Sequence, residues 1–210
     1  MDVHAPHEPV HTWRDFFTHL TIVTIGLFIA LSLEGLVEYV HHRHLVREAR
    51  ENIRKEIEDN HKAAQEDITL LQQDLDRTNT NLDTIRRMRA NPKTFKGTLT
   101  FTMSFDSLHD AAWNSARDTG ALGFMPYKEV QGYADLYQHQ KLVNDQSIEA
   151  IHRQTLAMSP VFMEKDLAAI PTNQTENLLH DAAATLIDVT TLQQIVQHLD
   201  TLYVEELKKP

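Results

Sequence analysis

The sequence predicts an all-α protein with one N-terminal transmembrane helix that continues into a coiled-coil-like stalk and an antiparallel helical bundle. Three observations lead to this prediction: an uncharged apolar stretch near the N-terminus, apolar residues in heptad spacing along two later segments, and only 6 glycines and 7 prolines among 210 residues. So few turn-forming residues leave little material for tight hairpins or a many-stranded sheet.

The apolar stretch predicts a transmembrane helix over residues 16–40, preceded by a short extracytoplasmic N-terminus, residues 1–15. Residues 16–33 read FFTHLTIVTIGLFIALSL, about 27 Å of helix, and apolar residues continue to Val40. A signal peptide would start with a basic region and end at a small-residue cleavage site, whereas this N-terminus is acidic and LEGLVEYVHHRH follows. A buried core helix is the other alternative.

Basic and aromatic residues at the two ends of this segment predict its orientation. The N-terminal flank carries Arg14, whereas five basic residues follow Val40 within twenty positions. The excess of Lys and Arg places the N-terminus outside and the C-terminal domain in the cytoplasm. Aromatic rings, histidines and arginines at the ends are expected to anchor the helix in the membrane interface: Trp13, Tyr39, His41, His42, Arg43, His44 and Arg47.

One stripe of this helix differs from the Leu, Ile, Val and Phe around it. Gly26, Ala30, Glu34 and Glu38 recur every four residues. Small residues at this spacing let another helix approach closely, and carboxylates at the membrane edge need a partner or water. The stripe predicts contact with another transmembrane helix, of a second copy or of another subunit. The alternative is that both glutamates simply lie in the interfacial layer.

Residues 41–90 predict a long charged helix, the stalk. No proline or glycine occurs between Tyr39 and Ala90, and Asn91-Pro92 ends the helix. The heptad spacing is typical of a coiled coil, formed either between two chains or by the stalk folding back on its own C-terminal helix. The predicted seam contains Ile57, Ile68, Leu71, Leu75, Leu82 and Ile85, with His61, Ala64 and Thr78 at intervening seam positions.

Residues 91–210 predict the remaining helices of the bundle, near 104–118, 126–158 and 173–207. The segment KTFKGTLTFTM at 93–103 alternates threonine with apolar residues, but one isolated strand cannot build a sheet, so it is expected to be a connector. Ser104 or Asp106 is expected to cap the helix that follows. The last helix carries a second heptad series: Leu178, Ala182, Thr185, Val189, Leu192, Val196, Leu199 and Tyr203.

Composition and motifs give no sign of catalysis, cofactor binding or metal binding. The net charge of −10 argues against a nucleic-acid binder, and zero cysteines exclude disulfides and thiolate chemistry. No glycine-rich phosphate loop or nucleophile elbow is present. Glu58-x-x-His61 matches half of a di-iron signature without a second copy, and of the HHRH run only His41 and His44 share a helix face.

Two stretches together resemble a known family. The first is TIVTIGLFIALSLEGLVEYVHHRHLVREARENIRKEIEDN, and the second is AAWNSARDTGALGFMPYKEVQGYADLYQHQ. This arrangement resembles a widespread group of uncharacterised bacterial single-pass membrane proteins. The resemblance covers roughly residues 16–60 and 108–140, and it implies a protein of the bacterial inner membrane with a helical soluble domain. It implies no activity.

These features favour a non-enzymatic single-pass membrane protein that scaffolds or stabilises a larger membrane complex, as an accessory subunit of a respiratory or photosynthetic assembly, for example. Its expected partners are the lipid bilayer and either other transmembrane subunits or a second copy. A sensory or ligand-binding bundle on a membrane anchor is the alternative, and a metal-binding bundle built around His61 is a second one.

Overall fold

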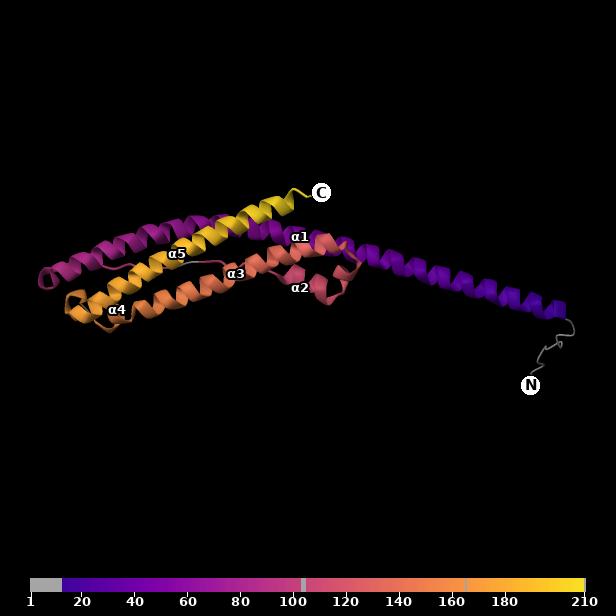
Figure 1. The fold of residues 1–210 in the computed structure, drawn as a ribbon, viewed down its shortest axis with the longest axis horizontal. Coiled ribbons are helices and arrows are strands. Elements are labelled where there is room, and N and C mark those ends of the chain that lie inside the picture. The colour runs from indigo at the N-terminus through magenta and orange to yellow at the C-terminus, as the bar shows by residue number, and fades with distance from the viewer. Residues whose placement is uncertain (1–12, 103–104, 165, 210) are drawn as a thin grey trace, which may run out of the picture. The chain divides into compact units, whose positions relative to one another are not determined.

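The computed structural model describes residues 13–102, 105–164 and 166–209, and these residues form helices and connecting segments without a β-strand. The five α-helices are α1 (Trp13–Ala90), α2 (Ala111–Asp118), α3 (Tyr127–Ala157), α4 (Ser159–Met163) and α5 (Thr172–Leu207) (Figure 1). Three short 3-10 helices connect them: η1 (Pro92–Thr94), η2 (Ala121–Phe124) and η3 (Leu167–Ala169). The all-α prediction is confirmed for this part of the chain.

The chain forms two units, Met1–Glu48 and Ala49–Pro210. The described part of the first unit is the N-terminal portion of α1, and its residues 13–41 are all exposed. It contains a segment that is long and apolar enough to cross a membrane. Its threonine and serine hydroxyls bond carbonyls four residues back, as Thr21 does to Phe17, so no hydroxyl of these residues is left unpaired in an apolar environment.

The second unit is a bundle of α3, α5 and the part of α1 from Ala49 onward. Helices α3 and α5 run in opposite directions, since Arg153 bonds Asp188 while the rings of His139 and His198 lie 5.5 Å apart. At the far end of α1, Leu82, Ile85 and Met88 form one apolar core with Ile170, which follows η3, and with Leu178 and Ala182 of α5. The end of the predicted stalk seam, Leu82 and Ile85, is therefore buried within one chain.

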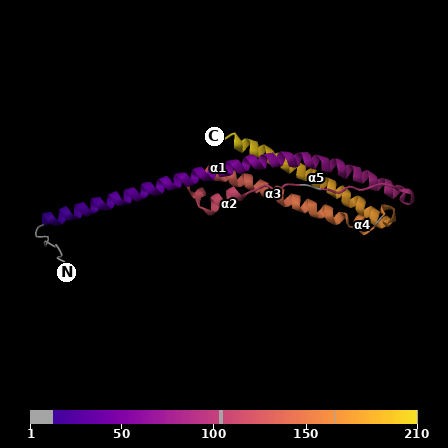
Figure 2. The same cartoon turned by 180° about the vertical axis from the view of Figure 1, so that it is seen from behind.

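An extended segment, here called the strap, joins η1 to α2. It comprises residues 95–102 and 105–110, and it runs back along α1 in both views (Figures 1 and 2). The sequence predicted a helix from about residue 104, but α2 begins at Ala111 and residues 105–110 are not helical. Ser104, one of the two predicted caps, lies outside the described residues, and Asp106 lies in the strap.

A glycine follows α2, and a proline precedes each of α3 and α5. After α2, Gly120 adopts φ +78°, a left-handed conformation that favours glycine, and reverses the chain into η2. Pro126 and Pro171 immediately precede α3 and α5, where a missing backbone N–H costs nothing.

Candidate functional site

The predicted packing stripe lies on the exposed part of α1. No residue of the most apolar 18-residue window of α1 is buried within the chain. Gly26 has no atom within 4 Å of the position where a Cβ would lie, and Ala30, Glu34 and Glu38 are also exposed. Glycine and alanine thus leave a shallow strip between larger apolar side chains, to which another helix can pack closely.

The predicted interface anchors form small local clusters at the two ends of this segment. Trp13 stacks on Phe17 and meets Phe16 edge-on, at centroid distances of 5.8 and 5.9 Å. At the other end, the Arg43 guanidinium lies 5.7 Å from the Tyr39 ring centroid. Arg47 contacts His44 Nδ1 at 3.2 Å, and the His41 and His42 rings lie 6.1 Å apart. Amphipathic rings and cations of this kind suit a headgroup region.

Inside the bundle, α1 carries a row of buried polar residues, here called the polar ladder: Asn60, Asp67, Asp74 and Asn81. They lie seven residues apart and are 0–5% exposed. Both asparagines of the ladder bond the strap backbone as donors and as acceptors. Asn81 accepts from Thr100 N (3.1 Å) and donates to Thr100 O (2.8 Å). Asn60 accepts from His109 N (2.8 Å) and donates to His109 O (2.7 Å).

The spacing of the ladder matches the rise of the strap. Asp67 accepts from Asp106 N at 3.1 Å, three strap residues before the Asn60 contact at His109. The Asn81 contact at Thr100 lies a further six strap residues back, for two more steps of seven along α1. Three extended residues advance about 10 Å, and seven helical residues advance about 10.5 Å. At Thr100, Asp106 and His109 the ladder therefore supplies hydrogen bonds that a neighbouring strand would supply in a sheet.

Helices α3 and α5 complete the same network. Asn144 bonds both the N–H and the carbonyl of Leu108, at 3.1 and 3.0 Å. Gln140, 1% exposed, donates to His109 O (2.7 Å) and accepts from the Tyr203 hydroxyl (2.7 Å) and from Asn60 (3.1 Å). The Gln140 side chain of α3 thus ties together all three long helices, because its oxygen accepts from Asn60 of α1 and from Tyr203 of α5.

Glu56 fixes the start of α2. Its carboxylate accepts from Ala112 N (2.8 Å), from Trp113 N (3.4 Å) and from the Tyr137 hydroxyl (2.7 Å). A carboxylate at a helix N-terminus pairs otherwise unsatisfied N–H groups and interacts favourably with the helix dipole. The Trp113 ring stacks on Tyr137 at 5.4 Å, and burial together with Glu56 raises the pKa of the Tyr137 hydroxyl. This phenol stays a neutral structural donor.

Two ladder carboxylates are only partly satisfied. Within the described residues, the Oδ2 atoms of Asp67 and Asp74 are buried without a hydrogen-bond partner. Burial raises the pKa of Asp67 to about 6, with smaller contributions from Asp106 and Glu66, although the Asp106 N–H acts in the opposite direction. Burial also raises the pKa of Asp74, against the effect of Arg77 3.0 Å away.

The histidines do not assemble a metal site in the described part of the chain, where no three His, Asp or Glu side chains come together. His61 Nδ1 lies 2.8 Å from Asp200 Oδ1. His61 therefore links α1 to α5.

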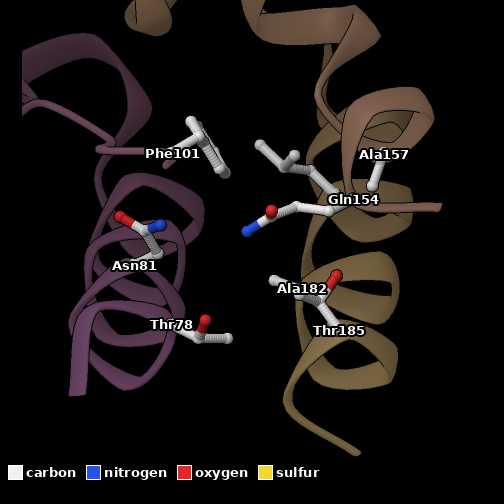
Figure 3. A pocket seen from close by; sticks show the side chains of 8 residues that line it. Thr78, Asn81, Phe101, Gln154, Ala157, Ala182 and Thr185 are labelled. Atoms are coloured by element: carbon white, nitrogen blue, oxygen red, sulfur yellow. The ribbon is translucent and has the colours of Figure 1, made fainter. Parts of the chain in front are cut away.

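A small cavity lies between α1, α3, α5 and the strap (Figure 3). Phe101 lies on one side, Gln154 and Ala157 of α3 lie on the other, and the Gln154 amide points toward Asn81. The cavity volume of about 10 Å³ is at the limit for one water molecule. It is too small for an organic substrate.

Comparison with protein-family models, with curated proteins and with solved structures finds no match to this chain. The resemblance to bacterial single-pass membrane proteins therefore stays a prediction from the sequence.

The predicted stalk seam and the buried face of α1 overlap only in part. Ile57, Leu71, Leu82 and Ile85 are buried, whereas Ile68 and Leu75 are half-buried at its border. The residues that precede them, Asp67 and Asp74, are buried in the core instead. A search for apolar residues in heptad spacing does not find the ladder, because it assigns Asn and Asp to the surface. Their own heptad repeat at 60, 67, 74 and 81 was the signal available in the sequence.

Proposed function

We propose that this protein is a single-pass membrane protein without catalytic activity, which uses its membrane span to dock on a transmembrane helix and so scaffolds a larger membrane complex. The observation that carries the proposal is the exposed apolar segment of α1. Its residues have no cover from their own chain, and burying a Leu, Ile or Phe side chain is worth about 1.5–3 kcal/mol. A bilayer and a partner helix provide that burial.

The interior of the bundle also supports a structural role. Its buried amides bond the strap and each other, and the hydroxyls of Tyr137 and Tyr203 bond side chains of neighbouring helices, so these groups hold the helices together. The Glu56 carboxylate, which a catalytic site would keep free, is occupied by two N–H groups and a phenol. Buried polar groups that are fully engaged in hydrogen bonds favour a rigid scaffold over a catalytic site.

The stripe of Gly26, Ala30, Glu34 and Glu38 is the proposed docking face. A partner helix packs on the two small residues, and the two carboxylates meet donors of the partner or interfacial water. The bias of basic residues toward the C-terminal flank supports an N-terminus outside and a bundle in the cytoplasm, and the family resemblance supports the bacterial inner membrane as the location.

Co-purification tests the docking face. The tagged protein is extracted from native membranes in mild detergent, and the co-purifying proteins are quantified by mass spectrometry. Gly26→Leu with Ala30→Leu should release the partner or reduce the oligomer size. Ile25→Leu with Phe28→Leu, on the opposite side of the helix, is the control and should leave the complex unchanged. Identical partners and oligomer size in both double variants would contradict the proposal.

A further inference from the structure

A charged groove opens in the bundle between the first turns of α1 in this unit, the start of α3 and the C-terminal turn of α5. Its volume is about 440 Å³, enough for a small organic ligand. The Ile57 and Tyr133 side chains, 1% and 9% exposed, lie along it. It is the larger of the two cavities described here, and the strap network does not use it.

Charges of both signs line this groove. Arg50 forms a two-pronged ion pair with Glu129, at 2.6 and 2.7 Å. Lys209 pairs with Glu206, and Glu51 also lines the groove. Arg54 donates to the carbonyls of Leu207 (3.0 Å) and Lys209 (3.4 Å) at the end of α5, and it pairs with Glu58 at 3.4 Å. Its side chain is nevertheless half exposed. The carboxylates would repel a simple anion, and the guanidinium groups would repel a simple cation.

Tyr133 adds a neutral donor to these charges. Its hydroxyl forms no hydrogen bond with the other described residues, although the side chain is nine-tenths buried. Burial and the nearby Glu129 and Glu206 raise the pKa of Tyr133 to about 12, so the phenol keeps its proton at neutral pH. Tyr133 lines the groove, so a hydroxyl donor without an acceptor in the protein is available there to a ligand that brings one.

We propose that this groove binds the zwitterionic headgroup of an ethanolamine phospholipid. The phosphodiester takes the hydrogen bonds of the Tyr133 hydroxyl and the guanidinium groups of Arg50 and Arg54, and the ammonium group lies against Glu206. Such a ligand matches both signs of charge without adding net charge to the groove.

The proposed membrane span lies close in sequence to the groove, and its bilayer would supply this headgroup. Arg50 follows Val40, the last residue of the proposed span, by ten positions, and ten residues extend over at most about 35 Å. The inference in this form rests on the membrane anchoring proposed above. The groove chemistry itself does not depend on a partner protein.

Titration calorimetry on the full chain in uncharged maltoside micelles tests the groove. Glycerophosphoethanolamine should bind, whereas glycerol 3-phosphate and ethanolamine alone should bind at least tenfold more weakly. Tyr133→Phe should weaken binding about tenfold, because it removes one donor to a charged acceptor. This variant loses no hydrogen bond to another residue that the structure describes, so it should fold normally. Tyr127→Phe, on the same helix with Tyr127 82% exposed, is the matched control.

A second variant narrows the groove without removing any of its groups. A Cβ at Gly132 would lie 3.4 Å from Lys209 Nζ and 3.8 Å from Glu206 Oε2. A Cβ alone fits at these distances, but the further atoms of Gly132→Leu should displace both side chains and abolish binding, while the better helix former raises the stability of α3. Unchanged affinity in both Tyr133→Phe and Gly132→Leu would overturn the proposed site, as would equal binding of glycerol 3-phosphate.

Lipid retention identifies the source of the headgroup. Native mass spectrometry of the protein extracted from membranes should show retained phosphatidylethanolamine in preference to phosphatidylglycerol, and Gly132→Leu should lose it. Binding of the soluble headgroup without retained lipid would contradict the lipid assignment. These measurements use the isolated protein, so a failure of the docking face on α1 leaves their outcome unaffected.

Discussion

Asn81 and Thr100 exchange two hydrogen bonds, in which the asparagine side chain pairs with the threonine backbone as a neighbouring strand would. The same arrangement joins Asn60 to His109 and Asn144 to Leu108. Side-chain amides thus hold an extended segment inside a helical bundle. This pairing explains why the core contains polar residues at regular heptad spacing and why the strap needs no sheet.

Removing one asparagine side chain of the polar ladder should destabilise the bundle. Asn60→Ala leaves the N–H and the carbonyl of His109 with fewer partners, and each buried unsatisfied group costs about 1–3 kcal/mol. We expect the free energy of unfolding to fall by roughly 2–4 kcal/mol in denaturant titrations. Asn79→Ala, at an exposed position of the same helix, should change it by less than about 0.5 kcal/mol. Equal effects of the two substitutions would show that the strap contacts contribute little.

Asp67 should make the bundle more stable as the pH falls. The pKa of Asp67 is raised to about 6 from 3.8, so between these values the folded state binds more protons than the unfolded state. Stability therefore rises as the pH falls from about 7 to 4, by on the order of 3 kcal/mol for this group. The stability difference between the wild type and Asp67→Asn should shift by this amount in favour of the wild type over that range.

An exposed aspartate provides the control for this pH dependence. The Asp83 side chain is 70% exposed, so Asp83→Asn removes a carboxylate of the same helix that is not buried. A stability difference for Asp67→Asn that changes with pH no more than the difference for Asp83→Asn would contradict a raised pKa at position 67.

Glu56 should control the order of α2. Glu56→Gln removes the charge that interacts with the N-terminus of α2 and weakens the bonds to Ala112 and Tyr137, which should cost about 1–3 kcal/mol. Because Trp113 stacks on Tyr137, the near-ultraviolet circular dichroism should weaken as well. Glu58→Gln, with a half-exposed side chain, should leave the spectrum unchanged. An unaltered spectrum in Glu56→Gln would argue against the capping role.

The proposed orientation predicts which residues face the cytoplasm. The chain contains no cysteine, so single cysteines can be labelled without background. In intact cells, a membrane-impermeant maleimide should label Thr12→Cys and should reach the exposed Thr201→Cys only after lysis. The opposite pattern would place the bundle outside and would favour the sensory alternative.

The sequence predicted the helices better than it predicted what binds them together. Every residue of the α5 heptad series, from Leu178 to Tyr203, is buried, because on that helix the core positions are apolar or threonine. On α1 the same criterion selected Ile68 and Leu75 beside the core and passed over Asp67 and Asp74. A polar side chain can be buried when it has a hydrogen-bond partner in the core. The partners of the two ladder asparagines lie in the strap, 19 and 49 residues away in sequence, so the local pattern does not reveal them.

The late start of α2 has a similar cause. Ser104 and Asp106 are good N-cap residues by local propensity, but Asp106 N and His109 N bond side chains of α1 instead. The actual cap, Glu56, lies 56 positions from Ala112. No local pattern could identify a cap that comes from another helix. The groove beside Tyr133 likewise depends on tertiary contacts among three helices.

Cysteine cross-linking along the span tests the central claim most directly. Single cysteines are placed at positions 22 to 36 and treated with a thiol-reactive photo-cross-linker in native membranes. If Gly26 and Ala30 face another helix, protein adducts should peak at positions 26 and 30 and be weakest near 25 and 28, with the period of a helix face. Adducts to lipid alone at every position, or protein adducts without this period, would contradict a docking face on the span.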